Sequence, residues 1–96
     1  MKKTELKEVV KKISEMEKRF DCLKEAFYID RKDVLENPFY SDMLFSLTEY
    51  YESGQWLCHY ELDEKGLLPK GIKRGVLSQD ELFNFLEELA KYKTDM

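Results

Sequence analysis

Cys58 and His59 are the residues whose types could most directly do chemistry, because together they offer a nucleophile and a base. A cysteine nucleophile needs a base within hydrogen-bond reach and a third group that orients the base. Neighbours in a helix point about 100° apart, and the chain has no second histidine. We therefore predict a protein that is not an enzyme and has no catalytic residues. We expect Cys58 to be a small buried side chain and His59 to lie at the edge of the core.

Metal binding needs three or four ligands at suitable spacing, and the sequence offers only weak candidates. The two cysteines and the histidine stand outside any CxxC or HExxH pattern. The acidic segment 61–64 lacks the spacing and the glycine of an EF-hand loop. We predict no metal site and no cofactor, and we expect the acidic segment to pair with Lys73 or Arg74.

The sequence GIKRGVLS, residues 71–78, brings two glycines, two cations and a helix start together. Phosphate sites combine similar parts, although the P-loop spacing is missing here. One interpretation is a structural turn whose glycines supply positive φ and whose arginine anchors the acidic segment, and we favour it. The alternative is a small-ligand or phosphate site, and its residues would be Gly71, Lys73, Arg74, Gly75 and Ser78.

Tyrosine and tryptophan are concentrated between residues 50 and 60, and both types dominate the hot spots of protein interfaces. Most of these side chains should lie in the core, but a domain of 96 residues has little room to bury thirteen aromatics. We expect the exposed remainder to lie near the basic connector. The predicted partner-binding residues are Trp56, Tyr60, Lys73 and Arg74.

The elements that must position these residues are helices. Apolar residues of the first segment are spaced 3, 4, 3, 4, 3, 4, which is a heptad seam: Leu6, Val9, Ile13, Met16, Phe20, Leu23 and Phe27. This predicts a helix over about 4–35, which would be roughly 45–50 Å long. A compact domain of this length is only about 26 Å across, so either the protein is elongated or the helix stops near Tyr28. A homodimer through this seam is the competing arrangement.

Further signals predict helices over about 39–53, 55–64 and 79–92, with a connector at 67–77. Asn37-Pro38 interrupts helical structure before the second helix, and Ser53-Gly54 ends that helix. Ser78 and Glu81 form a capping box at the start of the last helix. The predicted fold is a single all-α domain, in which an antiparallel helical hairpin has a C-terminal helix packed across it.

Charge is unevenly distributed along the chain. Residues 1–20 contain seven Lys or Arg against four Glu, whereas residues 21–66 contain four basic against eleven acidic residues. We expect the two segments to pair within the molecule, which argues against nucleic acid as a partner. The longest stretch free of charged side chains is eight residues, 53–60, so we expect no membrane association. Two cysteines do not make a disulfide framework, and we expect a cytoplasmic protein.

The stretch 50–86 resembles a short bacterial family of unknown function, whose pattern runs W…YExDExGxLP…KRGVLSxD. Here the pattern is carried by Trp56, Tyr60, Glu61, Asp63, Glu64, Gly66, Leu68, Pro69, residues 73–78 and Asp80. Cys58-His59 replaces an acidic pair, and the segment 28–40 is longer than usual. The resemblance implies a helical fold and a bacterial cytoplasm, and it assigns no activity.

These observations favour a non-enzymatic protein-interaction module, an accessory or inhibitory factor of a bacterium or its mobile elements. Its partner would be a protein, bound by the aromatic turn around Trp56 and Tyr60 together with the connector residues Lys73 and Arg74. The alternative function is the small-ligand or phosphate-binding protein that uses residues 71–78.

Overall fold

The computed structural model describes residues 2–95, with side chains through Tyr92. In this part of the chain every regular element is a helix, which confirms the predicted all-α fold. The elements are α1 (Lys3–Ile29), α2 (Arg31–Glu36), α3 (Pro38–Glu52), α4 (Gln55–Glu64), the 3-10 helix η1 (Gly75–Leu77) and α5 (Gln79–Asp95). The described chain measures 46 × 22 × 21 Å along its principal axes, so it is elongated.

The continuous helix expected over about 4–35 is wrong, because the chain breaks at Asp30. Asp30 has an extended backbone, and its N–H donates to the carbonyl of Ala26 to finish α1. Its carboxylate then accepts the N–H of Asp33 at 3.3 Å and caps α2. An aspartate side chain that bonds the backbone in this way competes with helix continuation. The helix thus stops just after Tyr28, and α1 alone still spans about 40 Å.

Local signals account for the other helix boundaries. The carboxamide oxygen of Asn37 accepts the N–H of Phe39 at 3.0 Å, and Pro38 occupies the first turn of α3. Gly54 has φ of 90°, a left-handed conformation that glycine adopts without strain, and it joins α3 to α4. α3 and α4 lie within one residue of the predicted ranges, and α5 begins at Gln79 as expected.

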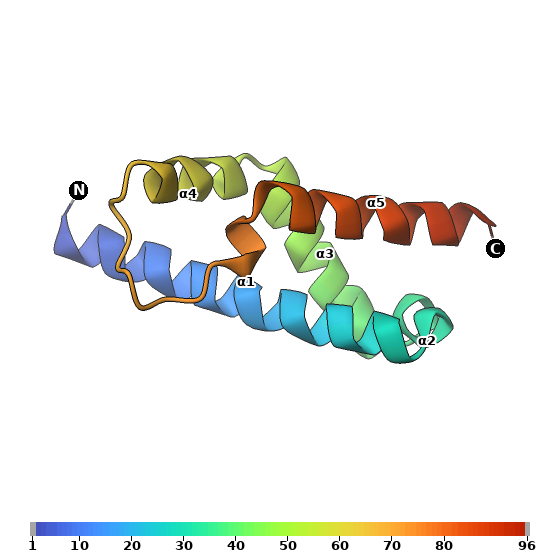
Figure 1. Ribbon diagram of the computed structural model, residues 1–96. Helices are drawn as coiled ribbons and strands as arrows, with labels where there is room; N and C mark the ends of the chain where they lie inside the picture. Colours follow the sequence, from blue (N-terminus) through green and yellow to red (C-terminus); the bar gives the residue numbers. More distant parts are fainter. Residues whose placement is uncertain (1, 96) are drawn as a thin grey trace.

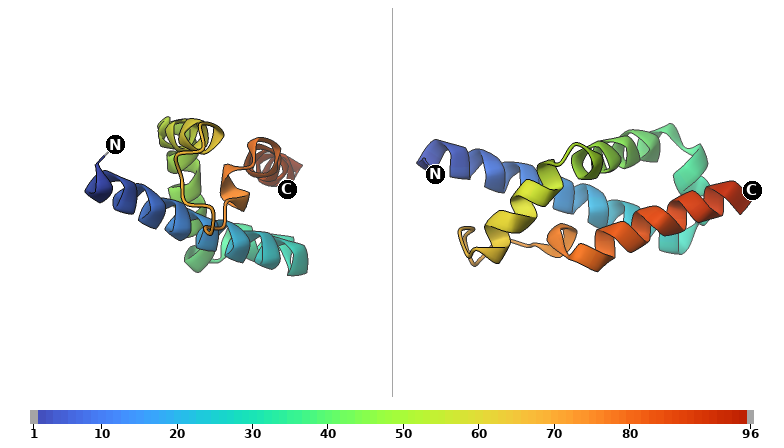
Figure 2. Two further views of the ribbon diagram at one scale, coloured as in Figure 1. Left: turned by 60° about the vertical axis from the view of Figure 1, so that its left-hand side comes forward. Right: turned by 90° about the horizontal axis from the view of Figure 1, so that it is seen from above.

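α3 returns obliquely against the direction of α1, whereas α5 runs in the same direction as α1 along its C-terminal half (Figures 1 and 2). The last helix contacts the C-terminal half of α1 through Phe85, and it runs obliquely to α1 in the view from above (Figure 2, right). α4 and the connector cover the other half of α1, and η1 lies where the connector reaches the middle of the molecule (Figure 1). Thus α4 and the connector lie over the N-terminal half of α1, and α5 lies over its C-terminal half (Figure 1).

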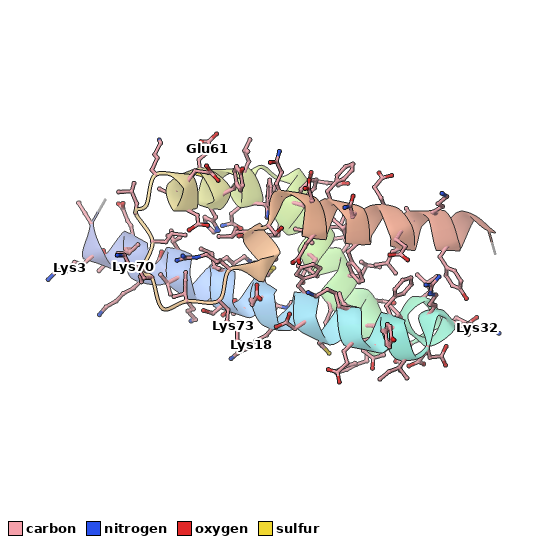
Figure 3. The ribbon with its side chains drawn as sticks, viewed as in Figure 1. Lys3, Lys18, Lys32, Glu61, Lys70 and Lys73 are labelled. Atoms are coloured by element: carbon pink, nitrogen blue, oxygen red, sulfur yellow. The ribbon has the colours of Figure 1, made fainter. Side chains whose placement is uncertain are left out.

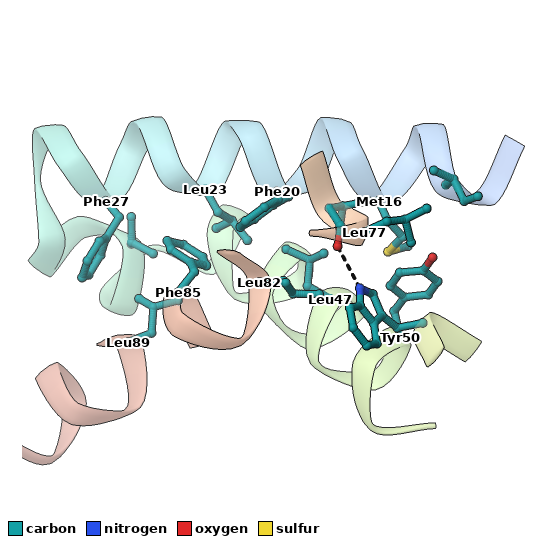
Figure 4. Close-up of a cluster of buried hydrophobic side chains, with 14 of the residues drawn as sticks. Met16, Phe20, Leu23, Phe27, Leu47, Tyr50, Leu77, Leu82, Phe85 and Leu89 are labelled. Carbon is teal, nitrogen blue, oxygen red and sulfur yellow. Dashed lines mark hydrogen bonds between the residues drawn. The ribbon is translucent and has the colours of Figure 1, made fainter. Parts of the chain in front are cut away.

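The heptad seam of α1 is the core of the single chain. From Ile13 to Phe27 its side chains are buried. Phe85 of α5 packs edge-on against Phe20 and Phe27, with ring centroids 5.5 and 5.8 Å apart (Figure 4). Leu47 and Tyr50 of α3 belong to the same buried cluster. Because α3 and α5 already cover the seam, it is not free for the predicted homodimer.

The expected pairing between the basic first segment and the acidic middle is absent from the described residues. Their ion pairs are Lys24–Asp21, Arg31–Glu88, Lys32–Glu36 and Arg74–Asp63. None of these joins residues 2–20 to residues 21–66. The charge asymmetry of the sequence is thus left on the surface of the folded chain.

Candidate functional site

The connector is held by two buried hydrogen bonds to one residue, Val76. The indole Nε1–H of Trp56 donates to the carbonyl of Val76 at 2.8 Å (dashed line in Figure 4). The N–H of Val76 donates to the carboxylate of Glu17 at 2.6 Å. Both side chains are buried, so both backbone groups of Val76 exchange water for a protein partner. This arrangement ties η1 to α1 and α4 at once.

Gly75 lies directly against the carboxylate of Glu17. A Cβ at this position would be 2.9 Å from Glu17 Oε1, which is closer than real Cβ atoms approach. The positive φ angles belong to Gly54 and Gly66, and neither lies in the 71–78 segment. The expectation that the connector glycines supply positive φ is therefore wrong, and at Gly75 the absence of a Cβ instead leaves room for the Glu17 carboxylate.

Arg74 is engaged within the chain. Its Nε lies 3.3 Å from the carboxylate of Asp63, and its Nη2 donates to the carbonyl of Pro69 at 2.5 Å. The predicted pairing of the acidic segment with Arg74 is therefore present. In the alternative ligand site the N–H of Val76 already has an internal acceptor, and the guanidinium donates through Nη2 to Pro69, whereas its Nε is ion-paired with Asp63 without a hydrogen bond. Gly71 and Lys73 remain exposed, and Ser78 is half-buried.

Trp56 is 6% exposed, so its predicted role as an exposed anchor is wrong. Its ring stacks on Tyr60 at 5.2 Å between centroids and also lies against Tyr51. Tyr60 is half-buried, and its hydroxyl donates to the side-chain oxygen of Gln79 at 3.4 Å. Of the four predicted partner-binding residues, only Lys73 is freely exposed. Trp56 and Tyr60 stack on each other, and Trp56 and Arg74 each bond a backbone carbonyl of the 67–77 connector.

Cys58 and His59 lie in the reverse of the expected places. Cys58 is exposed, whereas His59 is buried and its Nδ1 shares a 2.7 Å hydrogen bond with the hydroxyl of Tyr50. Desolvation by burial, with a smaller contribution from the charge of Lys12, lowers the pKa of His59 below its usual 6.5. Burial also raises the pKa of Tyr50. The histidine is thus a neutral core residue turned away from the thiol.

Two negative findings concern the described part of the chain alone. Within residues 2–95 no three His, Cys, Asp or Glu side chains gather closely enough to hold a metal ion. None of the helices over these residues combines the length and apolar character that crossing a membrane requires.

An apolar groove of about 340 Å³ lies between α3 and α5. In the view from above, α3 and α5 lie to the two sides of α1 (Figure 2, right). Phe83 lines the groove and is 46% exposed. The lining is formed by Leu35, Leu44, Thr48, Tyr51, Glu52, Phe83, Leu86, Glu87, Leu89 and Ala90. We call this feature the α3–α5 groove.

The sequence carries a signal for this groove that the heptad analysis missed. In α3, Leu44, Thr48 and Tyr51 follow i, i+4, i+7 spacing. In α5, Phe83 and Leu86 lie one turn apart, next to the core stripe of Leu82, Phe85 and Leu89. A helix with two adjacent apolar stripes has more apolar surface than one partner covers. A second apolar stripe in the sequence of a helix therefore predicts that the helix has an additional contact.

A second concave region of about 400 Å³ lies between α1 and the connector. Lys18 and Lys73 extend from this side of the molecule (Figure 3) and line it together with Glu17 and Asp21. Cations and carboxylates thus face the same space. This mixture offers neither the apolar surface of the α3–α5 groove nor an uncompensated positive field for an anion.

The comparisons with known proteins give one match. No curated protein and no solved structure matches the chain. A family model described as a domain of unknown function, DUF4298, matches residues 13–96. The match covers α2 to α5 and all of α1 from Ile13 onward, including the connector and the α3–α5 groove. The chain therefore belongs to the DUF4298 family.

Proposed function

We propose that the protein is a non-enzymatic protein-interaction module that binds a partner in the α3–α5 groove. The observation that carries this proposal is the concave apolar surface with the aromatic side chains of Tyr51 and Phe83 on its walls. Aromatic residues beside a pocket are those that contribute most to protein interfaces.

This proposal moves the partner surface away from the aromatic turn. Trp56 is held in the core, and Arg74 is paired with Asp63, so neither is free to anchor a partner. The small-ligand alternative at residues 71–78 has less support, because the buried carboxylate of Glu17 already accepts the N–H of Val76. An anion at that N–H would have to displace a buried negative charge.

The proposed setting is the cytoplasm of a bacterium, where the protein would act as an accessory or inhibitory factor. Cys22 and Cys58 are both free thiols, which supports a reducing compartment. A small module without a nucleophile–base pair would act by occupying or blocking a surface of its partner. Binding in the groove is sufficient for this role, and no catalytic step is required.

Selection of peptides displayed on phage against the folded, immobilised protein tests the groove. The variant Thr48→Trp fills the groove from α3 without changing charge, and Thr4→Trp is its matched control at an exposed position on α1. We expect selected peptides to bind the wild type and Thr4→Trp equally and to lose at least tenfold in affinity for Thr48→Trp. Amide shifts in nuclear magnetic resonance spectra should map to Leu44, Tyr51 and Phe83.

Circular dichroism and thermal melting establish that both tryptophan variants remain folded. If no peptide is selected, or if selected peptides shift the connector and α1 while the groove stays unchanged, the proposed function is wrong. In the second case the surface around Lys18 and Lys73 would be the binding site.

A further inference from the structure

The α3–α5 groove has a carboxylate on each side. Glu52 comes from α3 and Glu87 from α5; both are exposed and both line the groove. Neither forms an ion pair with another described side chain. α3 itself carries Asp42, Glu49 and Glu52 and has no lysine or arginine. The apolar strip is therefore flanked by negative charge that nothing on its own walls neutralises.

We infer that the occupant of the groove is an amphipathic α-helix of another protein, with lysine or arginine on both flanks of its apolar stripe. This inference rests on the proposed function and specifies the partner. Apolar side chains at i, i+3, i+4 and i+7 of such a helix would enter the groove. Its basic flanks would meet Glu52 and Glu87, and an arginine there can bond a carboxylate through two N–H groups.

The dimensions and walls of the groove favour a helix over an extended peptide. A volume of about 340 Å³ accommodates the side chains of an occupant and leaves its backbone outside. The walls are helices, whose backbone N–H and C=O groups are paired internally, so there is no strand edge for a peptide to extend. A third helix lying over α3 and α5 is the arrangement in which ridges of side chains fill such a groove.

The charge of the groove also excludes two other classes of occupant. A membrane surface rich in anionic lipid, or the phosphate backbone of nucleic acid, would be repelled by carboxylates on both sides.

A second copy of this chain has one basic amphipathic helix, α1. Its apolar residues Ile13 and Met16 are buried in its own core, and Leu6 and Val9 pack against that core. The basic helix must therefore come from a different protein.

Phage display of a helical library tests this inference. The library fixes leucine at the i, i+3, i+4 and i+7 positions and randomises the flanking positions. Selection against the wild type should enrich lysine and arginine on both flanks. Selection against the double variant Glu52→Lys/Glu87→Lys should enrich aspartate and glutamate instead. Basic peptides selected on the wild type should bind this variant about tenfold more weakly, from two surface ion pairs that turn repulsive.

The matched control is Asp42→Lys/Glu61→Lys, which makes the same change in net charge outside the groove. Asp42 is exposed on α3, and Glu61 points away from the body of the molecule on α4 (Figure 3). We expect this control to retain the preference for basic flanks and the affinity of the wild type. Equal losses in both double variants would show that net charge alone attracts the peptides and would overturn the inference.

The outcomes separate this inference from the proposed function. Peptides that map to the groove without enrichment of basic flanks would overturn the basic helix and leave the groove as a protein-binding site. A failure to select any groove binder would overturn both. Self-association in sedimentation that Glu52→Lys/Glu87→Lys abolishes would make a second copy the occupant and would also overturn the inference.

Discussion

At the scale of single residues, the contact between Gly75 and Glu17 explains why the connector has a glycine. The carboxylate occupies the space that a Cβ would need, and it accepts the N–H of Val76. Gly75→Ala would push the carboxylate away and leave a buried N–H without its acceptor. We expect a loss of about 1–2 kcal/mol in the free energy of unfolding, measured by urea denaturation.

Gly71→Ala is the control for this prediction. Nothing lies within 4 Å of a Cβ at Gly71, and its φ is not positive. The same substitution there should leave stability unchanged or raise it slightly by restricting the unfolded chain. Equal stabilities of the two variants would show that Glu17 moves aside at no cost and that its hydrogen bond contributes little.

His59 provides a pH-dependent prediction, since it is the one histidine of the chain. Its pKa is lowered in the folded state by burial, so the unfolded state binds a proton more readily. The folded protein should therefore lose stability as the pH falls below about 6.5. Urea midpoints compared at about pH 7.5 and 5.5 should fall more steeply for the wild type than for His59→Gln. Parallel slopes would mean that His59 does not contribute to the pH dependence.

The roles of these residues could not be read from local sequence. Val76 and Glu17 are 59 positions apart, and the capped helix after Ser78 offered a sufficient local explanation of the connector. The burial of His59 depends on Tyr50 of the preceding helix, which turns its hydroxyl toward it. By contrast, the Arg74–Asp63 pair was predicted, because a short connector keeps opposite charges on its two sides close to each other.

At the scale of elements, Asp30 decides whether α1 and α2 are one helix or two. Asp30→Ala would remove the carboxylate that caps α2 and introduce the residue that favours helix most. We expect a loss of about 1 kcal/mol from the missing cap. Carbon chemical shifts of residues 29–32 should move toward helical values. Asp42→Ala, at an exposed position within α3, should show neither effect. If the shifts at 29–32 stay unchanged, the break is set by packing of Val34 and not by the cap.

The helices themselves follow from local signals, whereas their partners do not. Asn37-Pro38 and Ser53-Gly54 mark helix ends through backbone geometry that any tertiary context must respect. The heptad seam identifies which face of α1 is covered without saying by what. Here Phe85 of the same chain covers it, so a pattern typical of a coiled-coil dimer serves an internal core. The α3–α5 groove arises at the same level, from a second apolar stripe on each helix.

At the scale of the whole molecule, the fold leaves a basic N-terminal helix and an acidic α3 on one elongated body. The described ion pairs are local or join neighbouring elements, so this asymmetry is not cancelled internally. It sets the sign of the charge that each surface attracts. The groove lies on the acidic part, which is why a basic partner is the one that the whole charge distribution favours.

The same distribution bears on oligomeric state, and we predict a monomer. The seam of α1 is buried by α3 and α5, and two copies that meet through their acidic grooves would repel each other. Sedimentation should give the mass of one chain, 11.5 kDa, and the melting temperature should not rise with protein concentration. Of the large apolar side chains outside the groove, those of Tyr28 and Ile29 are the most exposed, at 92% and 76%, and Phe45 and Phe39 of α3 follow. If a dimer forms, Ile29→Arg should dissociate it where the end of α1 at Tyr28 and Ile29 is the contact, and Thr48→Trp should dissociate it where the groove is the contact. The second result would place a second copy where we expect a basic helix.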